Sequence, residues 1–191
     1  SKIDIFVGGG GQDSGQTIIQ NDLLERADEL RQLANDGVPM LMICGMYQLF
    51  GRFFRTLKGE EIIGTNILPI ETIAGEERMI GNIIIKSQEF GKIIGYENHS
   101  GQTFLDKTVT PLGQVIKGAG NNMIDANEGV RYNNVIATYL HGPILPKNPQ
   151  IADFLINEAL SRRGISIDPE TDKIDDSLAN EAREISLKLP R

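Results

Sequence analysis

A continuous apolar stretch, 38–43, runs directly into the only cysteine of the chain, Cys44. A segment with helical spacing of apolar residues, 18–35, precedes it and ends at Gly37. A strand that is apolar on both faces must be covered on both sides, which favours a parallel βαβ arrangement. The sequence therefore predicts a doubly wound α/β fold, with a mostly parallel sheet and helices on both faces.

The first expected strand, 3–7, runs into four consecutive glycines at 8–11. Parallel strands end at the same edge of a sheet, so this glycine loop should lie beside Cys44, where open α/β sheets bind their ligands. Further strands are expected at 62–73, 79–86, 92–97, 113–116 and 135–140, and further helices just after Cys44, at 148–163 and at 177–189.

The length of 191 residues suits one domain, which we place at 1–164, followed by a helical extension at 165–191. Neither an apolar run of membrane-spanning length nor a signal-peptide pattern is found. One cysteine allows no internal disulfide, so we expect a cytoplasmic protein. The net charge of −7 disfavours nucleic-acid binding, and one cysteine with two distant histidines gives no spacing for a metal site.

The position of Cys44 favours a nucleophile over a small buried side chain, which is the commoner role of a lone cysteine. It ends a strand and opens a helix, where the helix dipole favours the thiolate. This is the layout of a nucleophile elbow, although such elbows prefer small residues two places to either side. Here those places hold Met42 and Met46, so we expect a less tight elbow or a narrower pocket.

The glycine run does not fit a phosphate-binding loop, since Gln16 stands where such a loop needs lysine. The dinucleotide pattern fails as well, at its third glycine. A plain glycine-rich turn is one alternative. The other is an oxyanion hole, in which backbone N–H groups of Gly10 and Gly45 point at a developing negative charge.

Two histidines, His99 and His141, are candidates for the general base. Each follows an apolar run, and the residues alone do not decide between them. Motifs decide more. The segment 43–49, ICGMYQL, resembles the cysteine elbow of cobyric-acid-synthase-type class I glutamine amidotransferases. Four further segments resemble one branch of that family, which acts in lipid II amidation, and they occur in the same order as in that branch. They are GGGQD at 9–13, YENH at 96–99, GAGNN at 118–122 and YLHGPIL at 139–145.

The resemblance implies a role for each matching residue. Cys44 matches the nucleophile and His141 the base, while His99 matches a histidine that is not the base and is taken as structural or pocket-lining. Arg78 matches the arginine that holds the substrate glutamine, and a guanidinium can grip an α-carboxylate with two hydrogen bonds. Gln48 matches a position that lines the glutamine pocket.

The resemblance also implies that the chain hydrolyses L-glutamine and needs no cofactor of its own. Its ammonia would pass to a MurT-like subunit of the Mur ligase family, which uses ATP and Mg to activate the D-glutamate α-carboxylate of lipid II in peptidoglycan synthesis. Two rivals are a cysteine hydrolase with the same elbow and an inactive partner-binding module. The amino-terminal strand and helix of the family are not recognised in this sequence.

One departure concerns the residue that orients the base. Many class I relatives place a glutamate two residues beyond the histidine, where this chain has Pro143. The orienting group must therefore come from elsewhere. A carboxylate of another chain is one possibility, and Glu97 and Asp13 are the first candidates within this chain.

Overall fold

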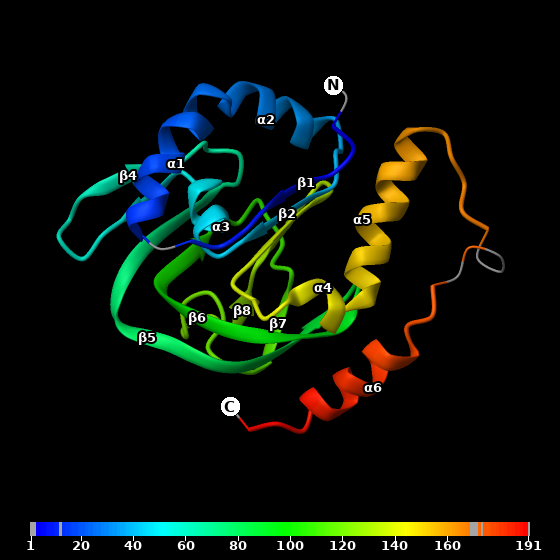
Figure 1. Ribbon diagram of the computed structural model, residues 1–191. Coiled ribbons are helices and arrows are strands. Elements are labelled where there is room, and N and C mark those ends of the chain that lie inside the picture. Colours follow the sequence, from blue (N-terminus) through cyan, green and yellow to red (C-terminus); the bar gives the residue numbers. More distant parts are fainter. Residues whose placement is uncertain (1–2, 12, 169–171, 173, 191) are drawn as a thin grey trace.

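The computed structural model describes residues 3–11, 13–168, 172 and 174–190. Within this part of the chain the strands form a four-stranded sheet, in the order β1-β2-β10-β9, and a six-stranded sheet, in the order β4-β3-β5-β7-β8 with β6 paired to β5 (Figure 1). The strands are β1 (Phe6–Gly8), β2 (Met40–Ile43), β3 (Phe53–Arg55), β4 (Glu61–Ile63), β5 (Ile70–Ser87), β6 (Gly91–Leu105), β7 (Gly113–Lys117), β8 (Asn127–Glu128), β9 (Val130–Tyr132) and β10 (Val135–Thr138). The helices are α1 (Asp13–Glu25), α2 (Ala27–Asn35), α3 (Gly45–Leu49), α4 (Ile144–Lys147), α5 (Pro149–Arg162) and α6 (Ser177–Ser186).

The four-stranded sheet has the parallel core that the sequence predicts. Strand β2 pairs in parallel with both β1 and β10, while β9 is antiparallel. Successive side chains of a strand point to opposite faces. Met40 and Met42 accordingly pack into the core cluster that contains residues of α2 and α3, whereas Leu41 and Ile43 join the cluster that contains residues of α5. The apolar stretch before Cys44 is therefore covered on both faces.

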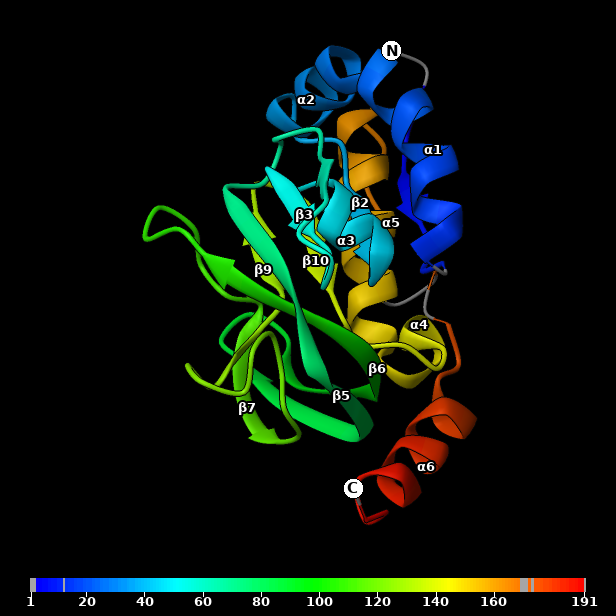
Figure 2. The ribbon, with the colours of Figure 1, turned by 90° about the vertical axis from the view of Figure 1, so that its left-hand side faces the viewer.

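The prediction of a mostly parallel sheet is wrong for the second sheet, which is antiparallel except where β3 meets β5. Its main feature is the long hairpin of β5 and β6 (Figure 2). The polar segment 75–78 resembles a turn in sequence, but a β-bulge between Ala74 and Met79 carries the strand across it. The full length of β6 was not predicted, because its inward-facing positions include the polar residues Glu97, His99 and Thr103. All three are buried.

Other boundaries also shift. The expected helix at 18–35 is two helices, α1 and α2, separated at Arg26. Strand β10 ends at Thr138, two residues earlier than expected, and α3 has only five residues. Helix α6 packs beside α4. Arg183 of α6 donates hydrogen bonds to the Lys147 carbonyl and to Oδ1 of Asn148, at 2.8 and 2.7 Å.

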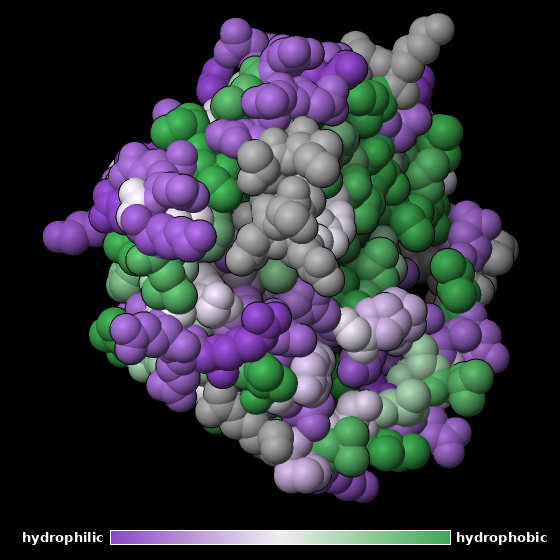
Figure 3. Space-filling view, turned by 60° about the vertical axis from the view of Figure 1, so that its left-hand side comes forward, coloured by the Kyte–Doolittle hydropathy of each residue, from purple (hydrophilic) through white to green (hydrophobic). Residues whose placement is uncertain are grey.

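The surface carries both hydrophobic and hydrophilic residues. Figure 3 shows hydrophobic residues gathered on the right-hand side of one face, with hydrophilic residues over much of the remainder. Exposed large apolar side chains include Ile3, Ile5 and Val7 around the edge strand β1, and Ile80 and Tyr96 on the hairpin. Among the described residues, no helix combines the length and apolar character needed to cross a membrane.

Asn148 ties the hairpin to the helical layer. Its fully buried side chain accepts a hydrogen bond from Ile94 N at 2.9 Å and donates to the carbonyls of Ile94 and Ile144, both at 2.8 Å. The backbone of β6 is thereby held against the segment that follows β10.

We predict that Asn148→Ala destabilises the protein, because it leaves buried backbone groups of Ile94 without partners. The free energy of unfolding should fall by about 2–3 kcal/mol, which for a domain of this size lowers Tm by roughly 4–12 °C. Thermal unfolding followed by circular dichroism measures this. The control is Asn157→Ala on the exposed side of α5, which should change stability by less than about 0.5 kcal/mol. Equal Tm values for both variants would contradict the role given to Asn148.

Candidate active site

Cys44 occupies a strained turn between β2 and α3. Its φ of 54° and ψ of −110° lie outside the regions that a residue with a Cβ prefers. Cys44 N donates to Thr138 O at 2.9 Å, and Gln48 N donates to Cys44 O at 3.1 Å. The half-buried thiol therefore stands at the start of α3, where the first backbone N–H groups have no partner within the helix. One of these is the N–H of Gly45.

Gly8 explains how the elbow accommodates Met46. A Cβ added to Gly8 would lie 2.3 Å from Cγ of Met46 and 3.1 Å from Sδ of Met42. The larger side chains at the elbow thus occupy the space that a side chain at the end of β1 would need. Met46 led the sequence pattern to predict a less tight turn. Gly8 has no side chain, and so it leaves room for Met46.

Gly10 lies against both of the predicted catalytic side chains. A Cβ built on Gly10 would be 3.1 Å from Cβ and 3.7 Å from Sγ of Cys44, and 3.4 Å from Nε2 of His141. The parallel pairing of β2 with β1 and β10 brings these three residues to one edge of the sheet, as the sequence predicts. Gly9 and Gly11 face open space instead.

His141 is held by the hairpin. The backbones of His141 and Tyr96 exchange two hydrogen bonds, of 2.8 and 3.1 Å, and Nδ1 of His141 lies 3.2 Å from Tyr96 O. A carbonyl oxygen only accepts, so Nδ1 carries the hydrogen and Nε2 keeps its lone pair. Burial lowers the pKa of His141, partly offset by the bond to Tyr96. The imidazole is therefore neutral at pH 7, as a general base must be.

Glu97, a candidate for orienting His141, is bound elsewhere. Its buried carboxylate accepts hydrogen bonds from the N–H groups of Ala119 and Gly120, at 2.8 and 3.0 Å. It thus anchors the loop that contains the GAGNN segment. Gln12 and the side chain of Asp13 lie outside the residues that the structure describes. The acceptor that the structure places at Nδ1 of His141 is the Tyr96 carbonyl.

The two predicted substrate-binding residues have different surroundings. Arg78 lies in the bulged segment of β5 and is exposed, with Nε donating to Oδ1 of Asn98 at 2.7 Å. Gln48 is buried on α3, and its Nε2 donates to the hydroxyl of Tyr139 at 3.1 Å. Arg78 is thus a surface residue, while Gln48 belongs to the core.

Several supporting residues were not singled out from the sequence. The fully buried Tyr139 hydroxyl lies 2.6 Å from Oγ1 of Thr103, which in turn lies 2.8 Å from Oγ1 of Thr72. Glu128 accepts hydrogen bonds from Thr138 Oγ1 and Tyr139 N, both at 2.7 Å, and so fixes the end of β10. In the sequence they are only polar residues within or beside apolar stretches, and their burial is seen in the structure alone.

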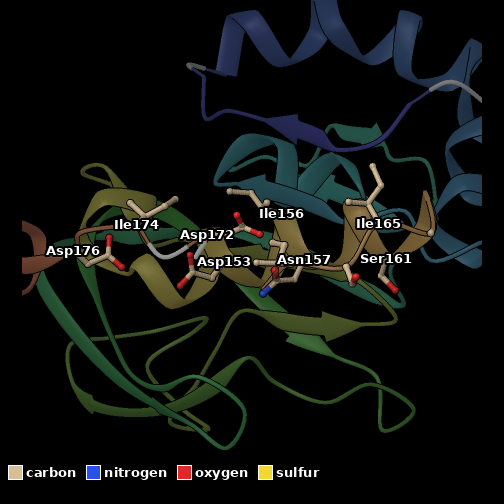
Figure 4. Close-up of a pocket in the computed structure, with 11 residues that line it drawn as sticks. Asp153, Ile156, Asn157, Ser161, Ile165, Asp172, Ile174 and Asp176 are labelled. Carbon is tan, nitrogen blue, oxygen red and sulfur yellow. The ribbon is translucent and has the colours of Figure 1, made fainter. Parts of the chain in front are cut away.

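Cavities do not by themselves locate this site. One of about 700 Å³ lies between α5 and the segment that follows it, lined by Asp153, Ile156 and Asp176 among others (Figure 4). None of the predicted site residues lines it. A second, of about 320 Å³, is mostly apolar and reaches Gly10 and His141.

Comparison with known proteins agrees with the geometry. Residues 1–149 match the CobB/CobQ-like glutamine amidotransferase domain. The chain is 42% identical over 184 residues to the subunit GatD of lipid II isoglutaminyl synthase (glutamine-hydrolyzing) from Staphylococcus aureus, covering 96% of this chain and 74% of that protein. The corresponding subunit of Streptococcus pneumoniae is 38% identical, with 97% and 73% covered. A crystal structure of a glutamine amidotransferase superposes with a TM-score of 0.61 at 17% identity, covering 82% and 79%.

The fold that brings this cysteine and histidine to one sheet edge is the α/β fold of class I glutamine amidotransferases. Within that class, this chain belongs to the CobB/CobQ-like glutamine amidotransferase family. The resemblance read from the sequence motifs is confirmed.

The Glu128 carboxyl predicts how stability depends on pH. Burial raises its pKa from 4.5 to about 7, against the hydrogen bonds from Thr138 and Tyr139. The folded state therefore holds this proton between pH 4.5 and 7 while the unfolded chain releases it, so the contribution of Glu128 to stability falls as the pH rises through that window. The loss is at most about 3.5 kcal/mol, at about 1.4 kcal/mol per pKa unit.

Glu128→Gln cannot ionise and keeps a carbonyl oxygen as acceptor. We predict that the free energy of unfolding of Glu128→Gln, measured relative to that of the unchanged protein, increases from pH 5 to pH 8. Urea unfolding at the two pH values measures the difference. Parallel pH dependence of the two proteins would show that Glu128 titrates normally.

Proposed function

We propose that this chain is the glutamine-hydrolysing subunit of a lipid II isoglutaminyl synthase, with Cys44 as nucleophile and His141 as base. The observation that supports this most is the approach of Gly10 to both Sγ of Cys44 and Nε2 of His141. The proteins named GatD, 42% and 38% identical, supply the particular reaction: ammonia from glutamine is used to amidate lipid II.

The first half of the reaction forms a thioester. Nε2 of His141 takes the proton of the Cys44 thiol, and the sulfur attacks the side-chain amide carbon of glutamine. The amide oxygen becomes an oxyanion, which the backbone N–H groups of Gly45 and Gly10 stabilise. When the C–N bond breaks, the protonated His141 gives its proton to the departing nitrogen, and ammonia leaves.

The second half regenerates the enzyme. Neutral His141 takes a proton from water as the water oxygen attacks the thioester carbon. The same N–H groups stabilise the second oxyanion, the C–S bond breaks, and glutamate leaves while the thiol regains its proton. The lowered pKa of His141 suits both steps, since the ring must begin each of them without a proton.

Substrate binding is assigned to Arg78. A guanidinium has five donors in a planar fork, and the structure shows Nε in use, on Asn98. Its terminal nitrogens suit the α-carboxylate of glutamine. Gln48, whose Nε2 donates to the Tyr139 hydroxyl, is assigned the family role of lining the glutamine pocket.

The acceptor of ammonia is proposed to be a MurT-like subunit of the Mur ligase family. Activation of a D-glutamate carboxylate requires ATP and Mg, which we assign to that cytoplasmic partner. Two facts support an assembly. The relatives are named as subunits, and the exposed apolar side chains of Ile80 and Tyr96 lie on the hairpin whose backbone holds His141.

The proposed function predicts glutamate release from L-glutamine that depends on Cys44. Cys44→Ala should abolish turnover, because no sulfur remains to form the thioester, while the fold and the co-purification of the ligase subunit persist. The unchanged chain with its ligase should turn over faster than the chain alone. Glutamate is measured by a coupled dehydrogenase assay. Turnover that survives in Cys44→Ala would overturn the mechanism, and hydrolysis of other amides in preference to glutamine would favour the rival cysteine hydrolase.

Arg78 gives a separate prediction. Arg78→Ala removes charge-assisted hydrogen bonds worth about 1.5–3 kcal/mol, so KM for glutamine should rise more than about tenfold. The matched control is Arg55→Ala on β3, whose partner is Glu61 at 2.7 Å. An exposed ion pair of that kind contributes little, so KM should stay the same. Equal KM values in the two variants would return Arg78 to an ordinary surface role.

A further inference from the structure

Glu128 links the two sheets next to the candidate active site. It belongs to β8, which pairs with β7 of the six-stranded sheet at Gly113. Its fully buried side chain reaches the four-stranded sheet, where Oε1 accepts hydrogen bonds from Thr138 Oγ1 and Tyr139 N, both at 2.7 Å. One carboxyl oxygen therefore joins the second sheet to the residues that lead from β10 to His141.

The course of the backbone explains why a side chain makes these contacts. The antiparallel ladder between β9 and β10 ends at Val130 and Ala137, so the N–H of Tyr139 lies beyond it. Gly129 turns the chain there with a φ of 63°, and a Cβ at this position would lie 2.6 Å from Ala137 O. A buried N–H needs an acceptor, and the Glu128 carboxyl supplies it where the ladder stops.

The peptide group between Thr138 and Tyr139 also holds the nucleophile. Its N–H donates to Glu128, as described above. Its carbonyl, Thr138 O, accepts the hydrogen bond from Cys44 N at 2.9 Å. A peptide group is rigid and planar, so Glu128 and Cys44 bind opposite sides of one unit. The direction of the bond that holds Cys44 at its strained φ and ψ therefore depends on Glu128.

The base is connected to the same carboxyl. The hydroxyl of Thr138 donates to Glu128 and accepts a hydrogen bond from Leu140 N at 3.0 Å. His141 follows directly, and its own N–H donates to Tyr96 O. The two backbone N–H groups before His141 are thus held by Glu128, one of them directly and the other through a single hydroxyl.

We propose that Glu128 is a positioning residue, which aligns Cys44 with His141 by fixing the peptide group that follows β10. This inference rests on the proposed glutaminase function. The role requires an acceptor oxygen at the place of Oε1. It does not require a charge, because Oε2 is buried without a hydrogen-bond partner among the described residues, which suits a neutral group better than a carboxylate.

The test separates the acceptor oxygen from the volume of the side chain. Glu128→Gln keeps an oxygen that can accept, whereas Glu128→Leu has a similar size and no acceptor. With L-glutamine and the ligase subunit, Glu128→Leu should lower kcat at least about tenfold, because misplaced reacting groups slow the chemical step. KM should change little, since the substrate carboxylate is assigned to Arg78. Glu128→Gln should recover most of kcat.

A second pair of variants tests the same contact from β10. Thr138→Val removes the hydroxyl that bridges Glu128 and Leu140 while it keeps the shape of the side chain, and kcat should fall. Thr138→Ser keeps a hydroxyl and should recover most of it. The control for lost stability is Leu33→Ala on α2, a buried residue of the core. It costs about 2–5 kcal/mol of stability, yet kcat per folded protein should stay the same below Tm.

Alkylation by iodoacetamide tests the placement of the Cys44 thiol without glutamine. The rate at pH 7 should fall in Glu128→Leu, because the thiol is no longer held at the start of α3, where its reactive thiolate is favoured. Leu33→Ala should react at the rate of the unchanged protein.

The failures can be told apart. No glutamine hydrolysis by the unchanged protein with its ligase would refute the proposed function, whereas the alkylation rates test the placement of Cys44 regardless. An unaltered kcat in Glu128→Leu, or an equal loss in Glu128→Leu and Glu128→Gln, would overturn the positioning role. An equal loss in Leu33→Ala would overturn it as well, by assigning the effect to stability. If Glu128→Leu does not fold, an unaltered kcat in Thr138→Val would overturn the role.

Discussion

The strained backbone of Cys44 is the constraint on which the site depends. A residue with a Cβ at φ 54° and ψ −110° costs of the order of 1–3 kcal/mol and persists only where its surroundings enforce it. Here the enforcement comes from both sides. The Cys44 N–H is fixed by Thr138 of the parallel neighbour β10, and α3 is anchored by the fully buried Tyr47 in its middle and Phe50 at its C-terminal end. In this conformation the thiol lies beside Gly10, where the proposed mechanism needs it.

The second support of the site is the hairpin, and it acts through backbone more than through side chains. Tyr96 holds both the main chain and Nδ1 of His141, so the orientation of the base depends on the register of β6. Inward-facing residues of β6 hold other parts of the structure. Glu97 anchors the loop at Ala119 and Gly120, and His99 stacks on Tyr139. A one-residue slip of β6 would turn all of these side chains to the other face.

The sequence predicts the part of the molecule that depends on local pattern. An apolar strand before Cys44, glycines after the first strand and a motif around His141 suffice to bring those residues to one sheet edge. The full length of the β5–β6 hairpin was missed because a polar bulge interrupts the apolar pattern of β5. The acceptor for His141 was missed for a related reason. It is the carbonyl of Tyr96, and every residue has a carbonyl, so no side-chain pattern can mark it.

The nature of that acceptor affects the chemistry. A carboxylate at Nδ1 would fix the tautomer and also stabilise the imidazolium, which raises the pKa of the ring. A carbonyl fixes the tautomer equally well but contributes only a partial charge, and the pKa of His141 is lowered by burial. His141, the proposed base, is therefore oriented and unprotonated in this chain, while a thiolate–imidazolium pair with Cys44 would be stabilised less than in a triad with an acid. Negative charge brought to this edge by the proposed partner subunit would supply the missing stabilisation. In the proposed assembly, glutamine would then be hydrolysed quickly only when an acceptor for the ammonia is present.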